Sequence, residues 1–236
     1  MNPETVQAAL ASQACEGPPP PDLPQPSRGE LYAHISATYR TLRIGLAAVA
    51  ILLPVALWIG TGQPRPSLSD YYHAGGWMRD LFVGALCAIG VFLALYKGYS
   101  SAEDVALDLA GVAAIVVALV PTDRREVPGV RVELAASGLV HMVAAVCFFL
   151  LIAYVCVFRS GDTLELMDEE RRRGFQRTYR LLGAAMLAAP AAAWGVRYLP
   201  GAAAYPYVFF AELAGVLVFA AFWIVKSREI GILERQ

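Results

Sequence analysis

The chain has 236 residues, of which 57% are hydrophobic and 17% are charged, and its mean hydropathy is +0.50. This composition excludes a soluble domain of ordinary make-up and is typical of an integral membrane protein. The net charge of -1 gives no reason to expect a nucleic-acid partner, and the basic residues form no stripe that would follow a phosphate backbone. We therefore expect membrane lipids as partners and no nucleic acid.

The two ends of the chain differ in composition from the rest. Residues 1–30 contain the run Pro18–Pro21, followed by Pro24 and Pro26, but few large apolar side chains. Such a segment buries too little surface to offset the conformational entropy that ordering would cost. We predict a disordered proline-rich tail over residues 1–30, a membrane domain over residues 31–228 and a cytoplasmic tail over residues 229–236.

Six apolar segments occupy the membrane domain. Each is roughly 17 to 25 residues long, which at about 1.5 Å per helical residue is enough to cross a hydrocarbon core of about 30 Å. The predicted fold class is all-α, an integral membrane bundle of six transmembrane helices. The predicted spans cover residues of about 41–62, 79–98, 105–121, 134–158, 179–199 and 205–226.

The distribution of basic residues predicts the orientation. With a cytoplasmic N-terminus, thirteen of the nineteen Lys and Arg residues fall on the cytoplasmic side and six on the outer side. Cytoplasmic loops are enriched in Lys and Arg, so this count favours cytoplasmic N- and C-termini. Most of the basic residues are Arg and Ala is abundant, which we associate with GC-rich bacterial genomes. We expect a multi-pass protein of the bacterial inner (plasma) membrane.

The sequence SDYYH, residues 69–73, defines the polar region of most interest. It lies in the loop before the second span, whose outer end carries Arg79 and Asp80. His141 and Glu212 each lie about two helical turns inside their spans from the same side. A charge facing lipid there costs at least about 2.5 kcal/mol, so both residues should face the interior of the bundle. We predict an outward-facing polar pocket formed by His73, Asp80, His141 and Glu212.

One interpretation of this pocket is a metal site. His73, His141 and Glu212 would be the ligands, with Asp80 or Asp123 completing the coordination shell. Imidazole and carboxylate ligands suit zinc, and an open position would hold an activated water. The spacing of these residues matches no local metal-binding motif, so this interpretation rests on the residue types alone.

Two other interpretations require no cofactor. The polar residues can form a buried network that fixes helix register, or bind a lipid headgroup whose anionic part meets Arg79 or Arg197. Alternatively, Glu212, His141 and Asp108 relay protons or ions across the membrane. The sequence does not decide between these interpretations and the metal site.

Ser69 precedes His73 by one helical turn. In that arrangement a hydroxyl and an imidazole share a helix face, as a nucleophile and its base do. The same residues are also typical of a turn or helix cap after the preceding prolines. Ser69 and Asp80 are the candidate catalytic residues if the protein is an enzyme, which the sequence leaves undecided.

Several segments together resemble a group of uncharacterised bacterial six-helix membrane proteins that share a domain of unknown function. The resemblance covers about residues 40–228. Its most specific pieces are the YYH and RD elements, His141, and the set Glu212, Trp223 and Lys226. It implies a fold and no activity. The Frag and DRAM type of six-helix membrane proteins is similar in architecture.

The pattern of Ser69, His73 and Asp80 also resembles the CREST superfamily of membrane hydrolases, which includes alkaline ceramidases. That resemblance implies a zinc-dependent hydrolase of a lipid amide or ester. The chain has six predicted spans where that family has seven, and Glu212 where its last span has paired histidines. We therefore expect a non-enzymatic lipid-binding, ligand-binding or structural role at the outer leaflet, with the CREST-type hydrolase as the alternative.

Overall fold

The structure, a computed structural model, describes residues 27–122, 136–196 and 206–234, apart from the side chains of residues 193, 194 and 196. The described residues form helices and contain no β-strand, which confirms the all-α fold class. The chain divides into two units, residues 1–38 and residues 39–236, and the second contains the helix bundle. Residues 1–26 of the predicted tail lie outside the described residues.

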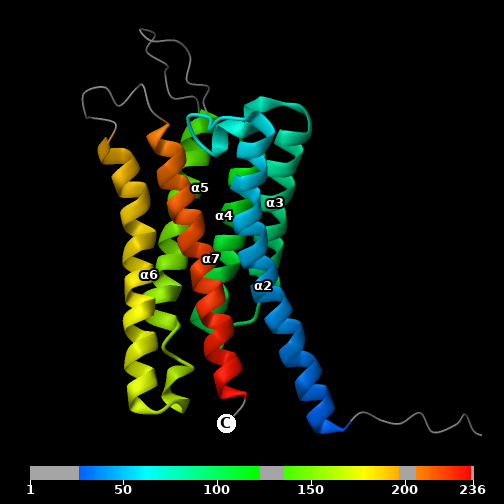
Figure 1. Ribbon diagram of the computed structural model, residues 1–236, viewed down its shortest axis with the longest axis vertical. Coiled ribbons are helices and arrows are strands. Elements are labelled where there is room, and N and C mark those ends of the chain that lie inside the picture. The colour runs from blue at the N-terminus through cyan, green and yellow to red at the C-terminus, as the bar shows by residue number, and fades with distance from the viewer. Residues whose placement is uncertain (1–26, 123–135, 197–205, 235–236) are drawn as a thin grey trace, which may run out of the picture. The chain divides into compact units, whose positions relative to one another are not determined.

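Six long helices are present in the described parts of the chain (Figure 1). They are α2 (Arg28–Thr61), α3 (Gly76–Leu95), α4 (Ser101–Leu119), α5 (Ala136–Tyr154), α6 (Glu169–Val196) and α7 (Tyr207–Leu233). Three short elements accompany them: the 3-10 helix η1 (Ser69–Ala74), the π-helix η2 (Val155–Arg159) and the 3-10 helix η3 (Leu164–Leu166).

Four described helical segments are long and apolar enough to cross a membrane, which supports the prediction of a membrane protein. They are Arg28–Thr61, Gly76–Leu95, Ala136–Leu166 and Tyr207–Leu233. Helices α4 and α6 are not among them, and both carry charged residues in their first turns. The count of six spans therefore stays a prediction.

Helix α2 begins at Arg28, within the range predicted as a tail. The local reason is a capping box at Ser27 and Glu30. The Glu30 backbone N–H donates to Ser27 Oγ at 3.2 Å, and the Ser27 backbone N–H donates to Glu30 Oε2 at 2.7 Å. Because a capping box satisfies two backbone donors that the helix itself leaves unpaired, it favours a helix start at this point.

Helix α7 continues to Leu233, although the sequence predicted a tail from residue 229. Trp223, Lys226 and Ile230 are spaced three and four residues apart and are all buried, so they share one helix face. Glu229 is also fully buried. The end of α7 therefore places two ionisable side chains inside the protein.

Two glycines set the contact between α3 and α4. A Cβ added to Gly90 would lie 2.6 Å from the carbonyl oxygen of Gly111. A Cβ added to Gly111 would lie 2.5 Å from the carbonyl oxygen of Gly90. Small residues allow such close backbone approach in membrane helix pairs, and here neither position has room for a side chain.

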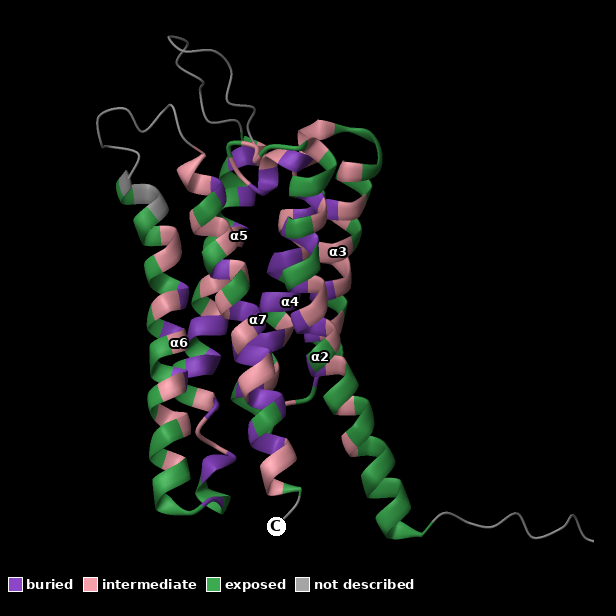
Figure 2. Ribbon diagram, viewed as in Figure 1, coloured by how far each residue is buried: buried purple, intermediate pink, exposed green. Residues whose placement is uncertain are grey.

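Within residues 39–236, helices that follow one another from α3 to α7 pack side by side. Their buried side chains form two apolar clusters, and Figure 2 shows exposed residues along the outward side of α6. The smaller cluster includes Leu57, Tyr71 and Phe209 and lies where α2 ends and α7 begins. We call this the SDYYH end, after residues 69–73. The opposite end of the bundle, near Lys226, is the Lys226 end.

Candidate functional site

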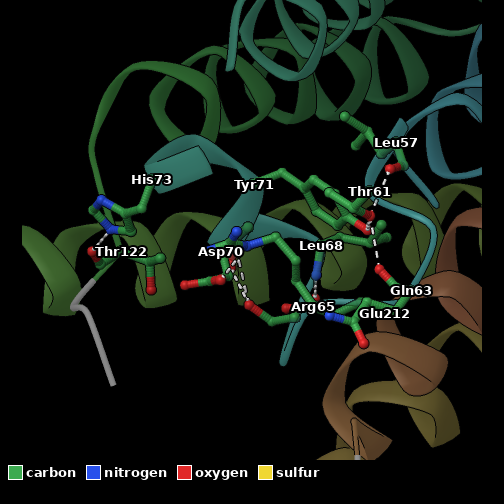
Figure 3. A network of polar contacts seen from close by, with 12 residues as sticks. Leu57, Thr61, Gln63, Arg65, Leu68, Asp70, Tyr71, His73, Thr122 and Glu212 are labelled. Carbon is green, nitrogen blue, oxygen red and sulfur yellow. Dashed lines mark hydrogen bonds and ion pairs between the residues drawn. The ribbon is translucent and has the colours of Figure 1, made fainter. Parts of the chain in front are cut away.

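The SDYYH segment folds into η1, whose turn is held by its own side chains (Figure 3). Arg65 Nε donates to Asp70 Oδ2 at 2.6 Å, and the Asp70 backbone N–H donates to Ser67 Oγ at 3.1 Å. The hydroxyls of Ser67 and Ser69 lie 3.1 Å apart, within hydrogen-bonding distance. These contacts lie within the loop before α3 and stabilise its turn locally.

Glu212 connects this loop to α7. The Glu212 Oε2 atom accepts a hydrogen bond of 2.5 Å from the backbone N–H of Leu68, and Leu68 is the residue directly before η1. The Phe209 backbone N–H, one turn earlier in α7, donates to the Pro66 carbonyl at 3.2 Å. Hydrogen bonds to carboxylates are stronger than those between neutral groups. Glu212 thus holds the loop against the start of α7.

The two histidines of the predicted pocket both bond backbone carbonyls just beyond α4. His73 Nε2 lies 2.6 Å from the Thr122 oxygen, and His141 Nδ1 lies 2.7 Å from the Val120 oxygen. A carbonyl oxygen only accepts, so each of these ring nitrogens carries the proton and donates. The pair joins η1 and α5 to the same end of α4, where helix carbonyls lack intrahelical partners.

The three predicted metal ligands do not converge. Among the described residues, no group of three or more His, Cys, Asp or Glu side chains is placed to hold a metal ion. Figure 3 shows His73 and Glu212 on opposite sides of Asp70. Asp123, predicted to complete the shell, and Arg197, predicted to meet an anion, lie outside the described residues. The described residues thus do not fit the zinc site that the CREST resemblance implies.

Arg79 and Asp80, near the start of α3, differ from the other predicted residues because both are exposed. Arg79 Nη2 donates to the Tyr72 hydroxyl at 3.0 Å, and its guanidinium carbon lies 4.5 Å from the centre of the Tyr72 ring. Neither Arg79 nor Asp80 forms an ion pair with a described residue. Tyr72 therefore orients a guanidinium that no acidic side chain of the described residues pairs with.

A second polar cluster, which the sequence analysis did not identify, lies at the Lys226 end. Lys226 Nζ and Glu229 Oε2 are 3.2 Å apart, and the two side chains are only 1% and 0% exposed. Lys226 Nζ also donates to Thr163 Oγ1 at 2.9 Å. Glu229 accepts hydrogen bonds from the hydroxyls of Thr163 and Tyr179. A buried charge is tolerated when it is paired and hydrogen-bonded, and both charges here meet that condition.

This cluster ties three parts of the bundle together. Lys226 and Glu229 come from α7, Tyr179 from α6, and Thr163 from the turn between η2 and η3. Removing one partner of a buried ion pair leaves the other charge uncompensated, which typically costs about 3–5 kcal/mol. The cluster therefore fixes the rotation of α7 relative to α6 and α5.

Arg43 and Tyr96 extend the polar contacts toward α2 and α3. Arg43 is 2% exposed, and its Nη1 donates to the Tyr96 hydroxyl at 3.4 Å. Tyr96 is itself 1% exposed, so this hydrogen bond lies inside the protein. Its ring also contacts Trp223 of α7, with ring centres 4.9 Å apart.

The comparison with known protein families matches residues 42–228 to the model described as "Protein of unknown function (DUF998)". The match covers more than three quarters of the chain. The chain belongs to the DUF998 family. No curated protein and no solved structure gave a significant match.

The DUF998 region contains the polar residues of the SDYYH end as well as Arg43 and Lys226, and Glu229 follows directly after it. Membership confirms the predicted resemblance to an uncharacterised family and assigns no activity. The predicted similarity to the Frag and DRAM type and to the CREST superfamily is not shown by these comparisons.

One feature of the sequence indicates part of the Lys226 cluster. Lys226 and Glu229 are three residues apart, a spacing at which opposite charges on a helix contact each other. The prediction of a cytoplasmic tail from residue 229 separated Glu229 from the span that ends at Lys226, so the pair was not recognised. Thr163 and Tyr179 lie 66 and 50 residues away from Glu229, so nothing local to α7 identified them.

Proposed function

We propose that this DUF998 protein is a non-enzymatic, multi-pass membrane protein that binds the headgroup of a zwitterionic phospholipid at its SDYYH end. The phosphate would meet Arg79, and the headgroup ammonium would meet Asp80. The observation that carries this proposal is the exposed Arg79 guanidinium, which is held against Tyr72 and forms no ion pair within the described parts of the chain. Arginine is suited to phosphate because its fork of N–H donors matches the phosphate oxygens.

The surroundings of Arg79 support a site at the membrane surface. Trp77, two residues earlier, is 57% exposed, and tryptophan is enriched at the level of lipid headgroups. The rest of α3 is apolar through Leu95. Arg79 and Asp80 therefore lie at the start of an apolar span, which is the level at which lipid headgroups are found. The contacts of Glu212 and His73 hold the adjacent η1 in place, so the site is preorganised.

The proposed topology places this site at the outer leaflet. We take α4 and α6 as spans in addition to the four apolar segments, which makes six. With both termini in the cytoplasm, the SDYYH end faces outward, and the membrane is the bacterial inner membrane. The packing of α4 against α3 and α5, and of α6 against α5 and α7, supports their placement in the same bundle.

Loss of Arg79 tests the proposal. We expect Arg79→Gln to weaken binding of phosphatidylethanolamine to the detergent-purified protein about tenfold, as loss of a charge-assisted hydrogen bond would. Asp80→Asn should weaken phosphatidylethanolamine while sparing phosphatidylglycerol, which has no ammonium. Native mass spectrometry with lipids of matched acyl chains measures the bound fractions. Arg40→Gln, which removes an exposed arginine of α2, is the control. Equal binding by wild type and Arg79→Gln would contradict the proposal.

The alternative is a CREST-type hydrolase, and no contact in the described residues favours it. A Ser69 nucleophile would need His73 as its base, but Ser69 pairs with Ser67 and His73 bonds the Thr122 carbonyl. The proposed binding role therefore accounts for more of the observed contacts.

Metal content distinguishes the two functions independently of lipid binding. We expect purified protein to contain far less than one zinc per chain, with no change in His141→Ala or Glu212→Ala, because those side chains bond the backbone. Inductively coupled plasma mass spectrometry after purification without chelators provides the measurement. Near-stoichiometric zinc that both substitutions remove would reverse the assignment in favour of the hydrolase.

A further inference from the structure

One face of α6 carries a ladder of arginines. Arg173, Arg177 and Arg180 are spaced four and three residues apart, so they project from the same side of the helix. They line an open surface depression together with Gln176 and Leu181. Tyr179, within this stretch, contacts Glu229, which places the ladder at the Lys226 end of the bundle.

Acidic neighbours do not neutralise the whole ladder. Side-chain nitrogens of Arg171, Arg172 and Arg173 all lie within 4.0 Å of a carboxylate oxygen of Asp168 or Glu169. Arg177 and Arg180 are exposed and form no ion pair with any residue in the described ranges. Two adjacent guanidiniums are therefore available to an anion from outside the chain.

The same face of α6 becomes apolar immediately after Arg180. Ala184, Leu187, Ala188 and Ala191 continue the four-and-three spacing and are all exposed. Leu181, beside Arg180, is 61% exposed. The face thus changes from cationic to apolar along the helix axis. This order matches a lipid, whose headgroup would contact the cationic part and whose acyl chains would contact the apolar part.

We propose that this face of α6 binds an anionic phospholipid, with its phosphate on Arg177 and Arg180 and an acyl chain along the alanine-rich stretch. Charge complementarity selects the anionic headgroup, since basic clusters next to membrane helices attract anionic lipids. The apolar continuation selects a lipid over a soluble anion. This site lies at the opposite end of the bundle from Arg79 and goes beyond the proposed function.

The test compares two lipids that have the same acyl chains but differ in the net charge of the headgroup. Native mass spectrometry of the full-length protein in neutral detergent should show phosphatidylglycerol binding about tenfold tighter than phosphatidylcholine with the same acyl chains. Arg177→Gln/Arg180→Gln should abolish that preference. The matched control is Arg171→Gln/Arg172→Gln, which removes two arginines that already have acidic partners and should retain it. Arg79→Gln should also retain it, which separates this site from the proposed function.

Several results would overturn the inference. Equal binding of the two lipids by the wild type would show that no anionic site exists. Loss of the preference in the Arg171 and Arg172 control would show a diffuse charge effect. Full displacement of phosphatidylglycerol by millimolar glycerol 3-phosphate would identify a soluble-anion site. If the Arg177→Gln/Arg180→Gln variant did not fold, the single variants Arg177→Gln and Arg180→Gln would decide the matter: each should reduce the preference, and an unchanged preference in both would overturn the inference.

Discussion

Lys226→Met is expected to lower the free energy of unfolding by about 3–5 kcal/mol. The methionine side chain is similar in length but carries no charge, so Glu229 would remain buried with a negative charge and without its ion-pair partner. The hydroxyls of Thr163 and Tyr179 can still donate to Glu229, but they do not neutralise it. Unfolding of the purified protein by sodium dodecyl sulfate in mixed micelles, followed by circular dichroism, measures the loss.

The second lysine of the chain provides the matched control. Lys97 is exposed in the connection between α3 and α4, so Lys97→Met should change the unfolding free energy little. Lys226→Met/Glu229→Gln removes both charges and should be less destabilised than Lys226→Met alone, because no unpaired charge remains. If Lys226→Met lowered the free energy of unfolding by less than about 1 kcal/mol, the result would contradict a tightly buried ion pair. If the double variant were no more stable than Lys226→Met, the unpaired charge would not be the cause of the destabilisation.

Gly90→Ala is expected to destabilise the bundle by about 1–3 kcal/mol, the usual cost of overpacking a tight contact. The new methyl group would meet the Gly111 carbonyl at 2.6 Å and Ile115 Cγ1 at the same distance, so the backbones of α3 and α4 would have to separate. The same unfolding assay measures the change.

Gly84 provides a control within the same helix. A Cβ added at Gly84 meets nothing within 4 Å, and alanine is favoured over glycine in helix interiors. Gly84→Ala should therefore be neutral or slightly stabilising. If both substitutions destabilised equally, glycine flexibility in α3 would be the cause, and the close contact with α4 would not.

The two ends of the bundle suggest different roles for their polar residues. At the Lys226 end the charges are buried, paired and shared between α7, α6 and the turn after α5, so their main effect is on helix packing. At the SDYYH end Glu212 and the histidines hold backbone groups, while Arg79 is exposed and has no ion-pair partner among the residues that the structure describes. For this reason the proposed binding site is at Arg79, while the observed contacts of Glu212 and the histidines hold the backbone around it.

Sequence reasoning located most of the helices but placed several ends incorrectly. The apolar runs identified α3, α5 and α7 because length and hydrophobicity are local properties of a membrane span. The start of α2 was missed because the capping box at Ser27 lies next to a proline-rich segment. The end of α7 was missed because Lys226 and Glu229 resemble boundary charges, and only their contacts with Thr163 and Tyr179 show that they are buried.

The sequence by itself determined the all-α class, the membrane character and the identity of the polar residues around SDYYH. Those properties depend on composition and on backbone hydrogen bonds between residues four apart. The tertiary structure decided which ionisable groups meet: Glu212 bonds the backbone of the η1 loop, and Lys226 joins a cluster from three parts of the bundle. Such contacts depend on how each helix is rotated and shifted against its neighbours, and close packing such as that of Gly90 on Gly111 sets that register.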